Sequence, residues 1–222
     1  MKKELKRPFL VGVTGGIGSG KSTVCRFLSD LGCALFEADR VARELQCSDP
    51  GIIAGIRKLF GHEVYAEGSG GSLQLDRRRV AAEVFSSPEK LMELNRLVHP
   101  AVYEAFHEAV EEARRQGIEV LVKEAAILFE AGRTADLDLI VVVVADRQLR
   151  LRRAVEKGLG SREEVLERMA SQWPQEKLVE KAGYVVPNEG TKEELRRQTE
   201  KLYQFILQEA ASCRDCSGKH GQ

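Results

Sequence analysis

The stretch FLVGVTGGIGSGKSTVCRFL, residues 9–28, decides the fold. Its first five residues form a short apolar run and, with Thr14, predict a strand at 9–14. A cluster of glycines follows, and apolar side chains then return at helical spacing over residues 20–31. A strand, a glycine-rich turn and a helix in direct succession predict a site that binds phosphate groups.

The turn between strand and helix, which we call the phosphate loop (residues 15–22), fits the pattern Gly-x-x-x-x-Gly-Lys-Ser in full. Glycine lets the backbone curl around an anion, so the N–H groups of the loop can point inward. We expect Lys21 to reach the β- and γ-phosphates of ATP and the Ser22 hydroxyl to bind Mg²⁺. The residues predicted to hold the nucleotide here are Gly16, Ile17, Gly18, Ser19, Gly20, Lys21, Ser22 and Thr23.

Four further apolar runs predict the other strands, at 33–38, 118–122, 139–144 and 184–186. Helical patterns separate them, and strands that alternate with helices indicate an α/β fold with a parallel sheet covered on both faces. The segment 48–116 contains no predicted strand and is interpreted as a helical insertion. Its last helix, over 88–116, is expected to break at Pro100.

Composition narrows the class of protein. The 222 residues include 34 Lys+Arg and 34 Asp+Glu, so the net charge is zero and gives no support for nucleic-acid binding. The longest uninterrupted apolar run, 139–145, is too short to cross a membrane, and we expect no signal peptide, because glycines break the apolar run that follows the basic residues near the start. Five cysteines do not suggest a disulfide framework in a chain of this size. We therefore expect one cytoplasmic domain, 1–222, a monomer or weak homo-oligomer, with no nucleic-acid or membrane partner.

Two carboxylates indicate which kind of phosphate enzyme this is. The guanine-reading pattern Asn-Lys-x-Asp is absent from the sequence, which argues against a GTPase. A kinase needs a carboxylate that accepts the proton of the acceptor hydroxyl. Glu37 and Asp39 lie two residues apart at the end of the second strand, so both can face the same side. Asp39 could be this base, or equally the N-cap of a helix that starts at Arg40.

The ordered motifs of the chain resemble those of the dephospho-CoA kinase family. The segment TGGIGSGKSTV, followed by LG…ADRVAREL, is similar to the family's phosphate loop and second strand. A phosphate loop alone is shared by many enzymes, whereas the whole set, in family order over about residues 9–200, is specific. The further matching segments are LDRRRVAAEVFSSPEKLMELNRLVHPAV, ILFE, SREEVLERMASQ and VPNEGTKEEL.

The resemblance implies a fold: a P-loop NTPase-type three-layer sandwich whose five-stranded parallel sheet has the order 2-3-1-4-5. Residues 9–47, 117–145 and 184–212 would form the nucleotide-binding core, 48–116 the helical acceptor-binding insertion, and 146–175 the lid region. It also implies a reaction, the transfer of the γ-phosphoryl group of ATP, with Mg²⁺, to the ribose 3′-hydroxyl of dephospho-CoA. In that reaction Asp39 would be the general base, and Asn188 would lie near the adenine.

Three residues are candidates for binding the acceptor, and each has a structural alternative. Arg77 either contacts the acceptor or belongs to a solvated basic run. His99, which precedes a proline, either contacts the acceptor or shapes its own helix. Glu130 either orients the acceptor or caps a helix.

The chain departs from the family pattern in two places that concern catalysis. Glu37 stands where the family usually has aspartate. In the lid region, Arg153-x-x-x-Lys157 is the nearest fit to the family's Arg-x-x-x-Arg. Arg150, Arg152 and Arg153 are all candidates for the catalytic lid cation, with Arg153 preferred; the alternative is a charged, solvated helix face. These departures leave two other functions open, a kinase of another small hydroxyl substrate such as a nucleoside, and an ATP-binding protein with weakened catalysis.

The last residues, 213–222, carry three potential zinc ligands, Cys213, Cys216 and His220. A second cysteine pair is missing from the sequence here, and the composition is typical of a flexible tail, which is our interpretation. Cys25 and Cys33 are interpreted as small core residues.

Overall fold

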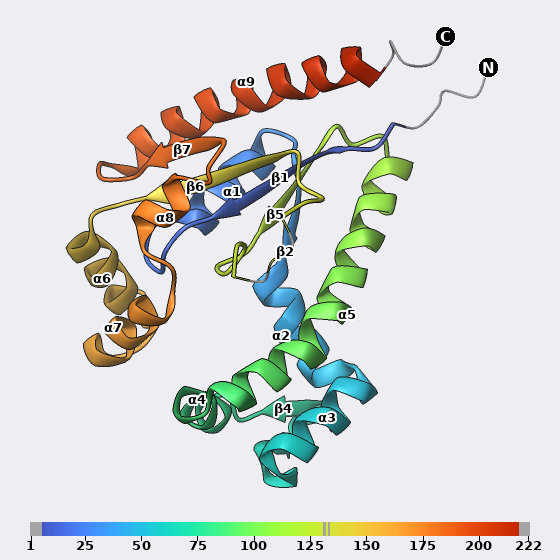
Figure 1. The fold of residues 1–222 in the computed structure, drawn as a ribbon, viewed down its shortest axis with the longest axis vertical. Helices are drawn as coiled ribbons and strands as arrows, with labels where there is room; N and C mark the ends of the chain where they lie inside the picture. The colour runs from blue at the N-terminus through green and yellow to red at the C-terminus, as the bar shows by residue number, and fades with distance from the viewer. Residues whose placement is uncertain (1–5, 131, 133, 218–222) are drawn as a thin grey trace. The chain divides into compact units, whose positions relative to one another are not determined.

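The computed structural model describes residues 6–130, 132 and 134–217 (Figure 1). Contacts within the chain divide it into two compact units. The first unit comprises the chain up to Phe36 together with the residues from Val110 onward, and the second comprises Glu37–Ala109. Each unit has its own apolar core.

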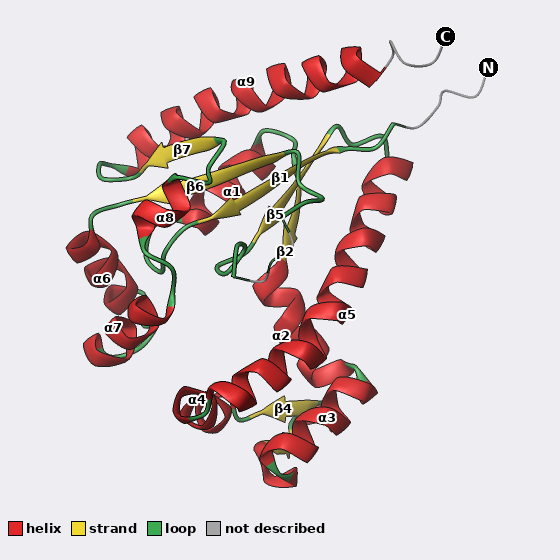
Figure 2. Cartoon of the chain, viewed as in Figure 1, coloured by secondary structure: helices red, strands yellow, loops and turns green. Residues whose placement is uncertain are grey.

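The first unit is built on a five-stranded sheet, drawn in yellow in Figure 2. The strands are β1 (Phe9–Thr14), β2 (Ala34–Glu37), β5 (Val120–Glu124), β6 (Leu139–Val144) and β7 (Tyr184–Pro187). Their order is β2-β5-β1-β6-β7, and β1 pairs in parallel with β5 on one side and β6 on the other. Counted as five core strands this is 2-3-1-4-5, so the predicted sheet and its order are confirmed.

Both faces of this sheet are covered. Val11 and Val13 of β1 are fully buried in a core that also includes residues of α1 (Lys21–Asp30) and α9 (Lys192–Ser217). Leu10 points to the opposite face, because side chains alternate along a strand, and it is buried as well. Burial on both faces explains why the central strands are continuous apolar runs in the sequence.

The predicted lid region contains three helices, α6 (Arg147–Glu156), α7 (Arg162–Ser171) and α8 (Gln175–Val179). Asp146 and Ser161 are N-caps whose side chains accept backbone hydrogen bonds, which fixes the starts of α6 and α7. Leu151 of α6 and Val165 of α7 pack together in a small apolar cluster, and Ile17 of the phosphate loop lies against it. The two helices are thereby joined to the loop.

The second unit is mainly helical. It contains α2 (Ala38–Ser48), α3 (Pro50–Phe60), α4 (Arg77–Ser86) and most of α5 (Pro88–Arg115), with short 3₁₀ turns at His62–Val64 and Ser69–Gly71. The prediction that 48–116 has no strand is wrong, because β3 (Tyr65–Glu67) pairs antiparallel with β4 (Leu73–Leu75) around the glycine-rich tip. Strands of three residues are too short to show an alternating pattern in the sequence.

The predicted break at Pro100 is wrong as well. Pro100 lies inside α5, which is one helix of 28 residues, and Figure 1 shows that this helix bends along its length. A proline removes one backbone hydrogen bond, and its ring presses on the preceding turn. When the residues on both sides favour the helical conformation, the helix bends at the proline and continues. The segments that flank Pro100 are rich in Leu, Ala and Glu, which favour the helix.

The last helix, α9, reaches Ser217, so it extends into the segment 213–222 that is interpreted from the sequence as a flexible tail, and the exposed Cys213 is helical. His220 and the side chain of Cys216 lie outside the described residues. In the part of the chain that the structure describes, no group of three or more His, Cys, Asp or Glu residues is arranged to hold a metal ion. Within the same residues, none of the helices combines the length and the apolar character that crossing a membrane requires.

Candidate active site

The phosphate loop joins β1 directly to the N-terminus of α1. Gly18 and Gly20 have positive φ angles of 76° and 100°, a conformation that glycine adopts without strain. A Cβ atom at Gly18 would come within 3.0 Å of the backbone of Arg150, and one at Gly20 would come equally close to the side chain of Asn188. Glycine is therefore required here for both the curl of the loop and the close approach of its neighbours.

Lys21 is the first residue of α1, and its side chain folds back over the loop. Its Nζ donates hydrogen bonds to the carbonyl oxygens of Gly15, at 2.7 Å, and Gly16, at 3.4 Å. The residue is 9% exposed. A buried ammonium group is thus held at the first residues of the loop, the position from which a phosphate-loop lysine reaches the terminal phosphates.

Ser22 follows in the same helical turn, and its hydroxyl donates a 2.6 Å hydrogen bond to Oε1 of Glu124. Glu124 is the last residue of β5, the strand beside β1, and it is buried. The strand predicted from the sequence ended at Val122, so Glu124 was not among the predicted site residues. An acidic residue directly after a buried apolar strand would have indicated it.

Two polar side chains of the lid region also meet the phosphate loop. The Oε1 atom of Gln172 accepts a 2.8 Å hydrogen bond from the backbone N–H of Ile17. The guanidinium group of Arg150 lies over Gly16, where an added Cβ atom would collide with it. Burial of this group lowers the pKa of Arg150 below its usual value, with a partial offset from Glu176.

Two buried polar atoms at the loop have no hydrogen-bond partner among the described residues, Nε of Arg150 and Oγ of Ser19. Buried donors normally have partners, and leaving one unpaired costs free energy that a bound water, ion or ligand can recover. Both are groups that donate to anions. The loop therefore fits the phosphate chain of a nucleotide.

Asn188 follows β7 and supports the loop from the side of the last strand. It is buried, and its Nδ2 donates a 2.7 Å hydrogen bond to the carbonyl oxygen of Ser19. Arg153, the preferred lid cation, donates to the carbonyl oxygens of Asn188 at 2.8 Å and Gly190 at 3.5 Å. The guanidinium of Arg153 thus braces the turn of residues 188–190, whereas the guanidinium of Arg150 covers the loop.

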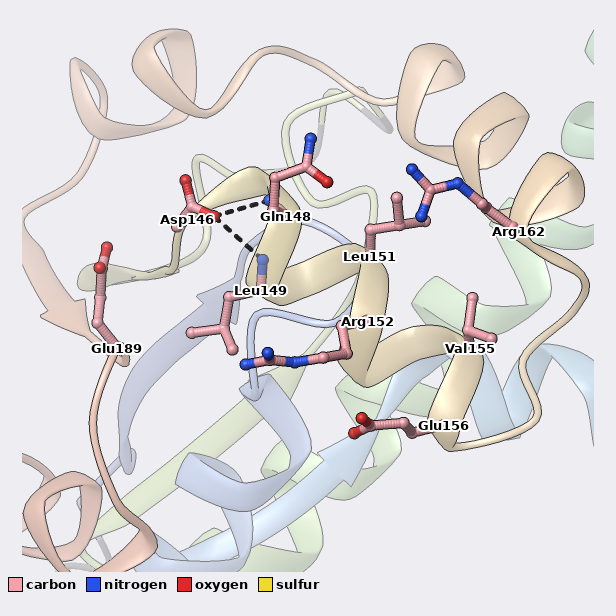
Figure 3. Close-up of a pocket in the computed structure, with 9 residues that line it drawn as sticks. All are labelled: Asp146, Gln148, Leu149, Leu151, Arg152, Val155, Glu156, Arg162 and Glu189. Carbon is pink, nitrogen blue, oxygen red and sulfur yellow. Dashed lines mark hydrogen bonds between the residues drawn. The ribbon is translucent and has the colours of Figure 1, made fainter.

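A pocket of about 640 Å³ opens beside α6, and Figure 3 draws the residues that line it. They come from α6 and its N-cap, from the first residue of α7, and from the turn after β7: Asp146, Gln148, Leu149, Leu151, Arg152, Val155, Glu156, Arg162 and Glu189. At Asp146 the backbone hydrogen bonds of Leu149 and Gln148, dashed in Figure 3, lower the pKa of the carboxyl group. The volume is within the range of small-molecule sites.

Asp39 lies in the first turn of α2, two residues after the end of β2, and it is exposed. Its carboxylate makes no hydrogen bond within the described part of the chain, and it is not the N-cap of α2, which is Glu37. Glu37 is instead paired with Arg40 at 2.9 Å, and Arg40 also pairs with Glu44 at 2.6 Å. Of the two carboxylates, only Glu37 is ion-paired among the described residues.

The three candidate acceptor residues have different surroundings. Arg77 donates to Oε1 of Gln46 at 3.0 Å and to the carbonyl oxygen of Arg43 at 3.1 Å, so it ties the start of α4 to the end of α2. His99 is half-buried in α5. Glu130 accepts a 3.1 Å hydrogen bond from the backbone N–H of Trp173 through Oε1. Asp39, Arg77 and His99 belong to the second unit, and Glu130 belongs to the first.

Comparison with known proteins gives a consistent result. The model of the family described as dephospho-CoA kinase matches residues 9–194. The dephospho-CoA kinase of Chlorobium luteolum is 57% identical over 212 residues, which cover 96% of this chain and 97% of that protein. The one from Chlorobaculum tepidum is 60% identical over 200 residues, which cover 90% of this chain and 96% of that protein.

Solved structures agree with these matches. The protein TT1252 from Thermus thermophilus is 34% identical and superposes with a TM-score of 0.74, over 92% of this chain and 98% of its own. A dephospho-CoA kinase from Campylobacter jejuni, 23% identical, shares the fold with a TM-score of 0.65, over 89% of this chain and 96% of its own. The family match runs from the start of β1 through the phosphate loop, the lid region and Asn188. The chain therefore belongs to the dephospho-CoA kinase family.

Proposed function

We propose that this chain transfers the γ-phosphoryl group of ATP to the ribose 3′-hydroxyl of dephospho-CoA, giving coenzyme A and ADP, through the residues described above. The single observation that carries the proposal is the family match over residues 9–194, which includes an intact phosphate loop. In this reaction the acceptor oxygen attacks the γ-phosphorus, and the bond from that phosphorus to the β–γ bridging oxygen breaks. ADP leaves with that oxygen, and the proton of the hydroxyl passes to a carboxylate.

The phosphate loop binds the triphosphate. Its backbone N–H groups and the positive end of α1 face the anion, and Lys21 neutralises the terminal phosphates. Asn188 holds the loop in shape through the carbonyl of Ser19. We place the nucleoside of ATP at the turn of residues 188–190, where Glu189 also lines the pocket of Figure 3.

Mg²⁺ fits the pair formed by Ser22 and Glu124. Protein-bound Mg²⁺ prefers hydroxyl and carboxylate oxygens, takes few of them, and completes its shell with water and substrate phosphates. The 2.6 Å hydrogen bond to Glu124 orients the oxygen of Ser22 that would bind the ion. When bound, the ion would reduce the negative charge on the β- and γ-phosphate oxygens.

Asp39 is the proposed general base. Its carboxylate is exposed and is not engaged by a cation within the described residues, whereas Glu37 is charge-paired with Arg40. A free carboxylate can accept the proton as the hydroxyl oxygen attacks. For the acceptor itself we retain Arg77, His99 and Glu130 as proposed contacts, and of these Glu130 has a buried oxygen, Oε2, without a hydrogen-bond partner among the described residues.

A coupled assay of ADP release with purified protein, ATP and Mg²⁺ tests the proposal. Dephospho-CoA is expected to stimulate turnover, whereas nucleosides and shikimate-like alcohols are not. Lys21→Ala should abolish phosphoryl transfer, and Lys201→Ala, an exposed lysine of α9, should leave it unchanged. Stimulation by another alcohol alone would assign the chain a different acceptor. Tight ATP binding with no stimulation by any acceptor would instead identify an ATP-binding protein without transferase activity.

A further inference from the structure

The lid region contains several cationic side chains that could contact the phosphates of ATP. Those on and just after α6 are Arg147, Arg150, Arg152, Arg153 and Lys157. Their contacts separate them. Arg153 is bonded to the carbonyl oxygens of Asn188 and Gly190. Arg152 lines the pocket beside α6, and Arg147 and Lys157 are exposed. Arg150 alone among the five has its guanidinium over the phosphate loop in the described structure.

The backbone of Arg150 lies against the phosphate loop. A Cβ atom at Gly18 would come within about 3.0 Å of three backbone atoms of Arg150, its O, C and Cα. This part of α6 is therefore packed directly on the loop, and the Arg150 side chain starts beside it. The same helix is anchored through Leu151, which is 2% exposed in the cluster that also contacts Ile17.

Two cations meet at the first residues of the loop. The ammonium of Lys21 bonds to the carbonyl oxygens of Gly15 and Gly16, and Nη1 of the Arg150 guanidinium lies 1.9 Å from the place that a Cβ atom of residue 16 would occupy. Arg150 forms no ion pair within 4.0 Å among the described residues, and its buried Nε has no hydrogen-bond partner there. The carboxylates of Glu176 and Asp146 attract this guanidinium only from beyond ion-pair distance, so an anion bound directly to it would stabilise the buried charge.

We propose that Arg150 binds the terminal phosphate of ATP together with Lys21 and is the lid cation of this enzyme. The proposal rests on the function proposed above and adds the residue that supplies this charge. A guanidinium presents several N–H donors in a planar fork, which suits the oxygens of a phosphoryl group. Lys21 reaches the β- and γ-phosphates, so a second cation beside it lies at the terminal end of the triphosphate, and we assign Arg150 to the γ-phosphate. That group carries the charge that changes during transfer.

The test compares Arg150→Ala with Arg150→Lys and with Arg147→Ala, an exposed arginine of the same helix. Calorimetry measures binding of the non-hydrolysable β,γ-imido analogue of ATP and of ADP, and circular dichroism checks the fold of each variant. Arg150→Ala should bind the analogue about 10- to 100-fold more weakly than the wild type, which is the affinity that a hydrogen bond to a charged group typically contributes. The affinity of the same variant for ADP should fall much less. The kcat for dephospho-CoA should fall by roughly 10²-fold. Arg150→Lys should recover part of the analogue affinity and part of the kcat. Arg147→Ala should match the wild type in both quantities.

Equal binding of the analogue by Arg150→Ala and the wild type would overturn the proposal, as would an equal loss for ADP and the analogue. Failure of the proposed function can be distinguished from failure of the role of Arg150. If the wild type does not phosphorylate dephospho-CoA, the acceptor is wrong, yet the selective loss of analogue binding in Arg150→Ala would still assign the terminal phosphate to Arg150. If the wild type is active and Arg150→Ala is equally active, the function stands and the role of Arg150 does not.

Discussion

The hydroxyl of Ser22 donates a 2.6 Å hydrogen bond to a carboxylate oxygen of Glu124. Ser22 is the second residue of α1 and Glu124 is the last residue of β5, so the pair joins the helix after the phosphate loop to the strand beside β1. A carboxylate that accepts a hydrogen bond from a hydroxyl fixes the direction of the lone pairs of that hydroxyl. If Ser22 binds Mg²⁺ as proposed, Glu124 would orient the oxygen of Ser22 and place a negative charge beside the ion.

Glu124→Gln removes that charge and keeps an oxygen that can still accept from Ser22. We expect the Mg²⁺ concentration for half-maximal activity to rise about 10- to 100-fold, the usual effect of losing a partner of a metal ligand. Calorimetry of Mn²⁺ binding in the presence of ATP should show the same shift. Glu119→Gln, an exposed carboxylate just before β5, is the control. An unchanged metal titration in Glu124→Gln would remove Glu124 from the metal site.

Asp39→Asn tests the proposed base. The amide cannot take the proton of the acceptor hydroxyl, so kcat should fall by roughly 10²- to 10⁴-fold while ATP binding stays within about twofold. Glu37→Gln is the matched control, because Glu37 is engaged with Arg40 and should not serve as the base. Its kcat should remain close to that of the wild type. A variant Asp39→Asn with full turnover would show that another group takes the proton.

Gly18→Ala tests the packing of the loop against α6. Alanine at a positive φ costs about 1–2 kcal/mol wherever it occurs, and at Gly18 its Cβ atom would also meet the backbone of Arg150. Gly32→Ala separates the two effects, since Gly32 has a φ of 102° and nothing within 4 Å of the added atom. We expect Gly32→Ala to lower the free energy of unfolding, measured with urea, only by the conformational cost, and to leave the affinity for ATP unchanged. Gly18→Ala should lose more stability and bind ATP at least about 10-fold more weakly; equal losses would refute the close contact.

The sheet and the phosphate loop could be predicted because their signals are local. A strand buried on both faces is apolar at every position, and the curl of the loop requires glycine at fixed positions such as Gly18 and Gly20. Both features appear in the sequence without knowledge of the rest of the fold. The order of the five strands came from the family resemblance, and the structure confirms it.

The contacts around the loop could not be predicted, because they depend on how distant segments pack. Ile118 looks like the start of a strand, yet its N–H donates to the carbonyl of Ala113 near the end of α5, and β5 begins two residues later. Pairing with β1 continues as far as Glu124, which is therefore the last residue of the strand. The choice between Arg150 and Arg153 depends on which side of α6 faces the loop. Arg153 fits the family spacing, but it is Arg150 that lies over Gly16.

Because of Cys33, we expect the stability of the fold to decrease with rising pH in the alkaline range. The thiol is 5% exposed in the core of the first unit, and its burial raises the pKa of Cys33 to about 12. In the unfolded chain a thiol titrates near pH 8.5–9. Below that pH both states keep the proton, so the thiol has no effect on the pH dependence. Above it the unfolded chain loses the proton and the folded chain keeps it, so the free energy of unfolding decreases as pH rises toward 12.

We therefore expect the wild type to lose up to about 1.4 kcal/mol of stability per pH unit through this group between pH 9 and 10, measured by urea unfolding. Cys33→Ala should lower stability at pH 7.5 but remove that part of the slope. Cys213→Ala, which changes an exposed thiol, should keep the slope of the wild type. Tyr65, whose pKa burial also raises to about 12, contributes equally to all three proteins and only at higher pH. Identical slopes in Cys33→Ala and Cys213→Ala would mean that the Cys33 thiol ionises as readily in the folded chain as in the unfolded one.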